Sequence, residues 1–312
     1  MAILDQTADE FAASAATPGA GAEHVAVDAG GERASWFQIA PLVVVLALFF
    51  GLPMLVVLAV SFFDFDRTDI VPAFILDNYV DLFRSEVTLR LYASSIKFAL
   101  IVWAVTLVLG FNIAYFLVFH VRTLLWQIGL FLLCTVPFWT SNIIRMISWI
   151  PFLGRNGIFN QTFMGLGIVS QPMDFLLFSD FAVVVAYVHL FTLFMVVPIF
   201  NSMARIDKSL LEAAHDAGAS RFRAVAEIVL PLSKSGIALG SIFVITLVMG
   251  DSFVVRTMSG GQSASVASAL QNEVAALQYP PAAASAVIMV IIVTLMVAGI
   301  LQLVDVRKEL AR

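Results

Sequence analysis

Two charged residues lie in or beside long apolar stretches of this sequence, where a charge is costly unless it has a partner or a function. Asp251 ends an uncharged run over residues 235–250, and Arg145 follows an uncharged run over residues 123–144. The carboxylate could bind a cationic solute, and the guanidinium could organise an outer gate. The two groups could equally form an ion pair between helices that only fixes their packing. The residues alone leave both interpretations open.

Polar and aromatic side chains accompany these charges and could line a path for an alkylammonium ion through cation–π contact. The candidate pathway residues are Asp251, Phe253, Arg145, Trp139, Trp149, Tyr115 and Asn142. Aromatic residues in such segments more often belong to the lipid interface or to the core. His189, in another apolar run, is expected to be a hydrogen-bonded packing residue rather than a proton relay.

The elements that must position these residues are membrane-spanning helices. The chain has 312 residues, of which 61% are hydrophobic and 12% charged, whereas soluble domains are about a quarter charged. A spanning helix needs about 20 apolar residues, so the fifth segment must continue through Asp251 to about Val255. The six predicted spans are residues 37–63, 92–119, 124–150, 180–203, 235–256 and 282–304.

The distribution of basic residues predicts the orientation of these spans. With both termini in the cytoplasm, ten Lys and Arg residues fall on the cytoplasmic side and five on the outer side. Residues 1–35 are rich in Ala, Gly and acidic side chains, which predicts a disordered cytoplasmic tail before one transmembrane domain over 36–312. No basic run suggests a nucleic-acid partner, and the single cysteine, Cys134, lies inside a span.

The cytoplasmic segment 205–234 has the pattern of a helical hairpin. Asp207 can cap a first helix, and Gly218 stands where a helix commonly ends in a left-handed residue. Ser220 can cap a second helix, which Pro231 is expected to stop before the fifth span. Such a hairpin either joins two spans at the membrane surface or docks a cytoplasmic protein.

One motif in this hairpin carries a family resemblance. Its residues are Glu212, Ala213, Ala214, Gly218, Ile228, Leu230 and Pro231. With three residues between the alanines and the glycine, and nine before the isoleucine, the motif resembles the EAA signature of binding-protein-dependent ABC transporter permeases. The resemblance implies an all-α integral membrane protein with the six-helix type I importer permease fold over roughly residues 40–310. It also implies that the hairpin is the coupling helix, which seats on an ATP-binding subunit.

A second set of residues resembles the spermidine/putrescine importer branch of that family. It comprises the run 109–116 in the second span and Pro137–Ser141 with Arg145, Trp149, Gly157 and Asn160. This resemblance implies a polyamine or a similar small cationic solute. Related branches carry opines, amino-acid derivatives, organic phosphonates or ferric ion, and these stay open as alternatives.

The sequence contains no GxxxxGK[ST], HExxH or GxSxG pattern and no CxxC pair, so we expect no catalytic residue, metal site or cofactor in this chain. The resemblance implies two ABC ATPase subunits carrying ATP and Mg, a second homologous permease subunit and an extracytoplasmic solute-binding protein. It places the chain in the lipid of a bacterial inner membrane. The rival classes are an ion-gradient-driven secondary transporter, which paired broken helices and several intramembrane carboxylates would favour, and a membrane scaffold.

Overall fold

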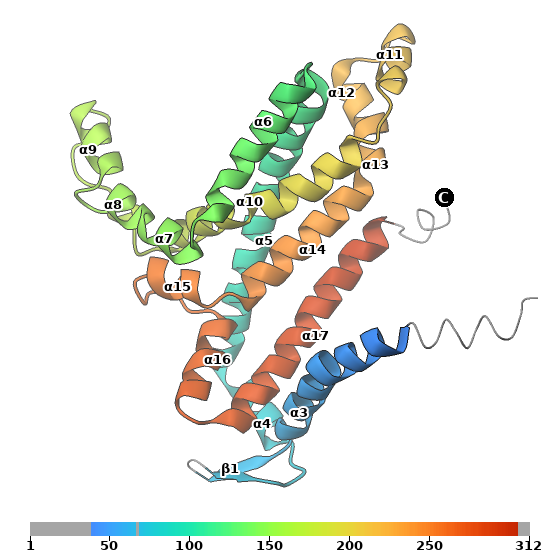
Figure 1. Cartoon of the computed structure of the whole chain (residues 1–312). Helices are drawn as coiled ribbons and strands as arrows, with labels where there is room; N and C mark the ends of the chain where they lie inside the picture. The colour runs from blue at the N-terminus through green and yellow to red at the C-terminus, as the bar shows by residue number, and fades with distance from the viewer. Residues whose placement is uncertain (1–38, 67–68, 305–312) are drawn as a thin grey trace, which may run out of the picture. The chain divides into compact units, whose positions relative to one another are not determined.

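The computed structural model describes residues 39–66 and 69–304 (Figure 1). The predicted tail over residues 1–35 lies outside the described residues. The chain divides into two compact units, Met1–Leu55 and Val56–Arg312. The described part of the first unit is helical and belongs to the helix Ile39–Val60, which includes the π-helical stretch η1 (Ala47–Gly51) and continues as α3 (Leu52–Val60).

Spanning segments dominate the described residues, as the hydropathy predicts. Four helices are long and apolar enough to cross a membrane: Ile39–Val60, Glu86–His120, Asp180–Met203 and Tyr279–Gln302. Two further segments meet this test only as bent pairs, Leu124–Trp139 with Asn142–Gly165 and Arg221–Leu232 with Lys234–Gly250. The described residues therefore hold four spans, or up to six if each bent pair is one span. An all-α membrane fold is confirmed.

The third predicted span is not one continuous helix. α6 (Leu124–Thr135) and the 3-10 turn η3 (Val136–Trp139) are followed by a bend of 93°. Pro137 lies in this turn and has no N–H to donate to the α6 ladder, which accounts for a break there. The chain then continues as α7 (Asn142–Ile147), α8 (Trp149–Leu153) and α9 (Ile158–Gly165).

The fifth predicted span is also interrupted, so the prediction that it continues through Asp251 is wrong. α14 (Lys234–Gly250) ends at Gly250, and Asp251 has extended backbone angles, φ −88° and ψ 129°. The Asp251 side chain accepts a hydrogen bond from the backbone N–H of Val254, at 2.8 Å, at the start of the separate helix α15 (Phe253–Met258). An aspartate side chain that accepts a hydrogen bond from the backbone N–H three residues ahead stabilises the beginning of a helix and disfavours a position in its interior.

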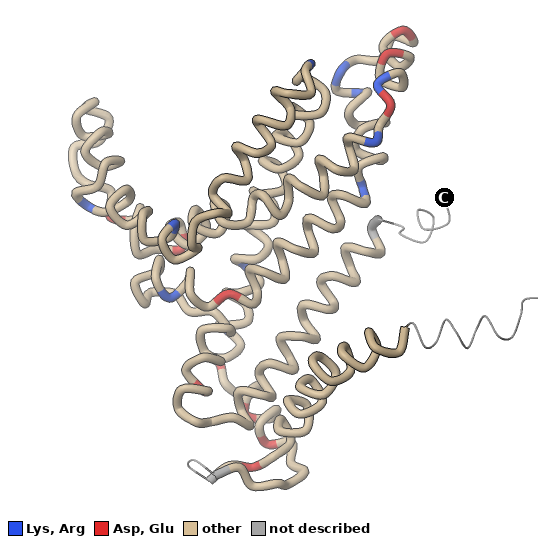
Figure 2. The backbone as a smooth tube through the Cα atoms, viewed as in Figure 1, with Lys and Arg blue, Asp and Glu red and all other residues tan. Residues whose placement is uncertain are grey.

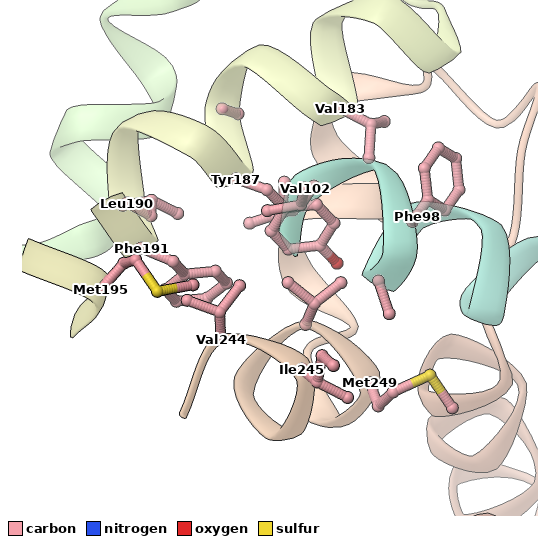
Figure 3. Close-up of a cluster of buried hydrophobic side chains, with 14 of the residues drawn as sticks. Phe98, Val102, Val183, Tyr187, Leu190, Phe191, Met195, Val244, Ile245 and Met249 are labelled. Atoms are coloured by element: carbon pink, nitrogen blue, oxygen red, sulfur yellow. The ribbon is translucent and has the colours of Figure 1, made fainter. Parts of the chain in front are cut away.

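The core of the second unit is formed by α5 (Glu86–Tyr115), α10 (Asp180–Met203) and α14, which pack against one another. Figure 3 shows side chains from these helices meeting, including Phe98, Val183 and Ile245. Met195 of α10 packs against Gly110 of α5 and Gly240 of α14. A Cβ added at Gly110 would lie 2.7 Å from Met195 Cγ, and a Cβ added at Gly240 would lie 2.7 Å from Met195 Sδ. The absence of side chains at these two positions thus lets the three helices close around Met195.

Shorter elements surround this core. α17 (Tyr279–Val304) packs against α14, α16 (Val266–Ala275) and α4 (Asp77–Arg84). It is tied to α5 by the Tyr92 hydroxyl, which donates to the Ser285 carbonyl at 2.7 Å. β1 (Asp64–Asp66) and β2 (Asp69–Val71) form an antiparallel pair, and the 3-10 turn η4 (Asp174–Leu176) precedes α10.

Candidate functional site

A cavity of about 480 Å³ lies where the two bent segments meet the core helix α10. The start of α7, the middle of α10 and the end of α14 with the start of α15 all contribute to its lining. Among its lining residues are Asn142, Met146, Phe191, Thr246, Asp251 and Phe253. Asp251 is the one ionisable side chain among the described residues that line the cavity. The space therefore combines apolar walls with a single negative charge.

The two oxygens of the Asp251 carboxylate have different surroundings. Oδ1 accepts hydrogen bonds from the Val254 N–H at 2.8 Å and from the Tyr187 hydroxyl at 3.3 Å. Tyr187 belongs to α10 and is fully buried in the core drawn in Figure 3. Within the described part of the chain, Oδ2 forms no hydrogen bond of good geometry, although the Phe253 N–H is a further backbone donor beside the carboxylate. Oδ1 is therefore held in place, and Oδ2 can accept from a bound cation.

Arg145 is buried beside this cavity, with 7% of its surface exposed. Its Nη2 donates to Oδ1 of Asn142, and its guanidinium carbon lies 5.2 Å from the ring centre of Phe138. Its Nε and Nη1 are buried without a partner in the described structure. The described residues form no ion pair between Arg145 and Asp251. Arg145 is instead connected to the cavity through Asn142.

The predicted pathway residues fall into separate places. Asp251, Phe253 and Asn142 line the same cavity. Trp149 lines a different, apolar cavity of about 610 Å³, where its Nε1 donates to His189 Nδ1 at 2.9 Å. His189 is therefore hydrogen-bonded and half-buried, as expected for a packing residue.

The other two predicted aromatic residues lie away from the cavity. Trp139 is 79% exposed at the end of η3. Tyr115 ends α5 and lines a third pocket, beside the hairpin. The four aromatic residues thus do not form one continuous path in this structure.

The sequence analysis did not identify Tyr187, Phe191 and Thr246 of the cavity region. Tyr187, like His189, is a polar side chain in a largely apolar run, and that was the signal that could have identified it. Its distance of 64 positions from Asp251 along the chain left no local pattern to connect them.

An ion pair elsewhere in the structure, between Lys97 and Asp180, contrasts with Asp251. Asp180, at the start of α10, accepts a hydrogen bond from Lys97 of α5 at 2.5 Å and another from Ser263. Both Lys97 and Asp180 are about half exposed. Asp180 is thus a partnered carboxylate outside the cavity.

The segment after α10 forms the predicted hairpin, with α11 (Lys208–Asp216) as its first helix. The Asp207 side chain caps α11 by accepting from the Ser209 N–H at 3.0 Å, and this bond lowers the pKa of the Asp207 carboxyl. Gly218 has φ +83°, a left-handed conformation that favours glycine, and Ser220 caps the second helix. The predicted caps and turn are confirmed.

The second helix of the hairpin ends one residue after Pro231, close to the predicted stop. It runs as α12 (Arg221–Ala224), the π-helical η5 (Val225–Val229) and α13 (Leu230–Leu232), and it bends by 68° into α14. Pro231 therefore lies in its last turn, before the bend. The π-helical widening directly before Pro231 is the kind of adjustment expected where a proline removes a backbone donor.

The hairpin has an anchored side and a free side. Ile206 is buried and Leu211 packs against the core, whereas Glu212, Ala213 and Gly218 are exposed. Phe222, at 84% exposure, is also free. Figure 2 shows charged residues of both signs gathered on α11 and α12, while the long helices are almost free of charge. The hairpin thus presents a polar surface with an exposed aromatic residue to a partner.

Comparisons with known proteins agree with this architecture. The family described as "Binding-protein-dependent transport system inner membrane component" matches residues 130–309. The chain is 35% identical over 230 residues to the spermidine/putrescine transport system permease protein PotB of Escherichia coli (strain K12), which covers 72% of this chain and 81% of that protein. It is 32% identical over 233 residues to PotB of Haemophilus influenzae, with 73% and 79% covered.

A solved structure shares the fold. It is the bacterial alginate ABC transporter in complex with alginate pentasaccharide-bound periplasmic protein, which superposes with a TM-score of 0.70. The match covers 89% of this chain and 96% of that chain at 15% sequence identity. At this identity the likeness concerns the fold alone.

Proposed function

Because the chain belongs to the family of binding-protein-dependent transport system inner membrane components, we propose that its cavity at Asp251 passes a polyamine or a similar small organic cation. The chain is a multi-pass inner-membrane permease subunit of an ABC importer, and it is not an enzyme. We propose that both of its termini are cytoplasmic.

The observation that carries the solute proposal is the single unpaired carboxylate oxygen in the cavity. Oδ2 of Asp251 forms no hydrogen bond of good geometry with the described residues, whereas Oδ1 is fixed by Tyr187 and Val254. A primary ammonium group is a compact donor that can approach one oxygen, and Phe191 and Phe253 supply aromatic faces for its charge and its methylene groups. The relatives that are named spermidine/putrescine permeases make a polyamine the first solute to test.

The hairpin is the element that we propose binds the ATPase. The residues in contact would be those of the motif, Glu212, Ala213, Ala214, Gly218, Ile228, Leu230 and Pro231. The exposed Glu212 offers a charge-assisted contact, and the left-handed Gly218 holds the turn between the helices. The anchored Ile206 and Leu211 would carry a displacement of the hairpin into the helix bundle.

The proposed assembly contains further chains. It consists of this subunit, a second homologous permease subunit, two ATPase subunits and an extracytoplasmic solute-binding protein. ATP and Mg would be held by the ATPase subunits, with no cofactor on this chain.

Two bent spans would also suit an ion-gradient-driven transporter. Family membership argues against that alternative, because the inner membrane components of binding-protein-dependent systems work with a separate ATPase. A single carboxylate in the cavity also provides few sites for a coupling ion.

The test is uptake into vesicles that contain the complete transporter. We expect ATP-dependent uptake of labelled spermidine or putrescine that excess unlabelled polyamine abolishes and that a phosphonate, an opine or ferric ion leaves unchanged. Uptake driven by an ion gradient without ATP would contradict the importer assignment. ATP-dependent uptake of an anionic solute instead would contradict the proposed solute and leave the importer assignment intact.

The role of the hairpin is tested by Gly218→Val and Glu212→Arg. Both variants should reach the membrane but lose uptake, because the turn is strained in one and the contact charge is reversed in the other. Glu86→Arg is the matched charge reversal. The Glu86 side chain is 78% exposed at the start of α5, away from the hairpin, and it pairs with Arg90 one helical turn away. Uptake that is undiminished in both hairpin variants would refute the coupling role.

A further inference from the structure

A polar pocket of about 460 Å³ lies between the end of a spanning helix and the hairpin. One wall is the last turn of the helix Glu86–His120, which ends in the π-helical η2 (Phe116–His120). The other wall is formed by α11, the turn and α12. This pocket is separate from the cavity at Asp251, and Glu212 is the one residue of its lining that the proposed transport mechanism uses.

The charged side chains of the pocket are mainly basic. They are His120, Lys208, Glu212, His215 and Arg221. Within the described part of the chain, neither Lys208 nor Arg221 forms an ion pair. Arg223, on the same short helix as Arg221, does pair, with Glu227 at 2.9 Å. The pocket therefore holds two cations, Lys208 and Arg221, against one carboxylate, Glu212, and none of the three forms an ion pair within the described residues, so its chemistry favours an anion.

The pocket is apolar on the side of the spanning helix. Tyr115 and Phe119 line it there, and Leu211 of α11 lines it opposite. The His120 ring is held by Tyr115, whose ring centre is 5.4 Å away, and by Phe116 at 5.8 Å. A ligand that fits both parts has an anionic head and an apolar body.

The position of the pocket identifies the source of such a ligand. A spanning helix ends at His120, so this turn lies where the hydrocarbon region gives way to the headgroups. Phosphate groups of membrane lipids lie at this depth, and basic residues at such a boundary attract anionic lipids. On the free side of the hairpin, Glu212 lines the pocket but Ala213, Gly218 and Phe222 do not, so most of that side remains available to a protein.

We propose that the pocket between η2 and the hairpin binds the phosphate of an anionic phospholipid through Lys208 and Arg221. The lipid would bridge the end of α5 and the hairpin, so that the lipid composition of the membrane influences the position of the hairpin. This inference requires that the chain spans a membrane and does not depend on the identity of the solute.

The test is lipid binding by the complete transporter. The complex is purified, stripped of lipid and titrated with phosphatidylglycerol, phosphatidylcholine or inorganic phosphate, and bound ligand is counted by native mass spectrometry. The pocket variant is Lys208→Gln with Arg221→Gln. The matched control is Arg205→Gln with Arg223→Gln, which removes the same charge from exposed positions outside the pocket.

We expect phosphatidylglycerol to bind more tightly than phosphatidylcholine. Each basic residue near an anionic headgroup contributes about a fivefold change in affinity, so the pocket variant, which lacks two, should bind phosphatidylglycerol about 25-fold more weakly. The control variant should bind it as the natural sequence does. An equal loss in both variants would overturn the proposal, because it would show a general effect of charge.

Two further outcomes would also overturn it. Inorganic phosphate that binds as tightly as phosphatidylglycerol would identify a site for a free anion instead of a lipid. Loss of the ATPase subunits from the pocket variant, with unchanged lipid binding, would identify the pocket as a protein contact. Because lipid is counted without solute, failure of this inference is distinguishable from failure of the polyamine proposal.

Discussion

The substitution Asp251→Asn separates the structural role of this residue from its charge. Asparagine retains an oxygen that can accept from the Val254 N–H, which Asp251 Oδ1 does at 2.8 Å. The start of α15 and the break after Gly250 should therefore survive. What the substitution removes is the negative charge of the carboxylate at Oδ2, the oxygen that forms no hydrogen bond of good geometry with the described residues.

The expected effect follows from the loss of one charge-assisted contact. A hydrogen bond to a charged group contributes about 2 kcal/mol, so the KM for a cationic solute should rise about thirtyfold. The maximal ATPase rate and the amount of assembled complex should remain close to those of the natural sequence. Asp180→Asn is the matched control, because Asp180 bonds Lys97 at 2.5 Å outside the cavity and its loss should leave KM unchanged.

The assay is ATP-dependent uptake of labelled putrescine over a range of concentrations, alongside the thermal stability of each complex. A double-mutant cycle with Arg145→Gln adds the second measurement. Since Arg145 and Asp251 form no ion pair, their coupling in stability should be below about 0.5 kcal/mol. An unchanged KM in Asp251→Asn, or strong stability coupling with normal uptake in the double variant, would refute the reasoning and leave Asp251 a packing residue.

Three other predictions concern packing, titration and the tail. Gly236→Ala should lower the melting temperature, at a cost of about 1–3 kcal/mol, because its Cβ would clash with the Pro198 carbonyl oxygen and lie 2.6 Å from Ser202 Cβ. Gly129→Ala, whose Cβ would have no atom within 4 Å, should leave it unchanged. Burial raises the pKa of Glu273, so the protein should lose stability as pH rises through that pKa, and Glu273→Gln should abolish this loss in melting curves across pH. Deletion of residues 1–35 should leave assembly and uptake unchanged, as purification of the complex and vesicle assays would show.

The sequence predicted the elements whose causes are local. Long uncharged runs identified the positions of the spanning segments, and Asp207, Gly218 and Ser220 predicted the hairpin because caps and left-handed turns depend on a few adjacent residues. The break at Asp251 was missed, although its cause is also local. Hydropathy shows that the fifth segment is apolar. It carries no information on the hydrogen bond that the Asp251 carboxylate accepts from the Val254 N–H.

The site was only partly predictable, because proximity across helices is a tertiary property. Asp251 could be identified from the cost of its charge, and Phe253 follows two positions later. Tyr187 could not be assigned to it, since only the packing of α10 on α14 brings the two together. Grouping Tyr115 and Trp149 with Asp251 relied on residue type alone, and the structure places them in other pockets.

The two helix breaks support a passage at the cavity independently of any charge. Backbone that leaves a helix within a membrane exposes unpaired N–H and C=O groups, which is tolerated only where protein or a water-filled cavity satisfies them. The break between η3 and α7 and the break between α14 and α15 both lie at one place. The first turn of α7 on one side and Gly250, Asp251, Phe253 and Val254 on the other line the same cavity of about 480 Å³. If these helices only packed against one another, nothing would explain why two of them are interrupted next to the same cavity. A route for a hydrated, charged solute does require polar backbone there, because the solute exchanges water for protein donors and acceptors as it moves.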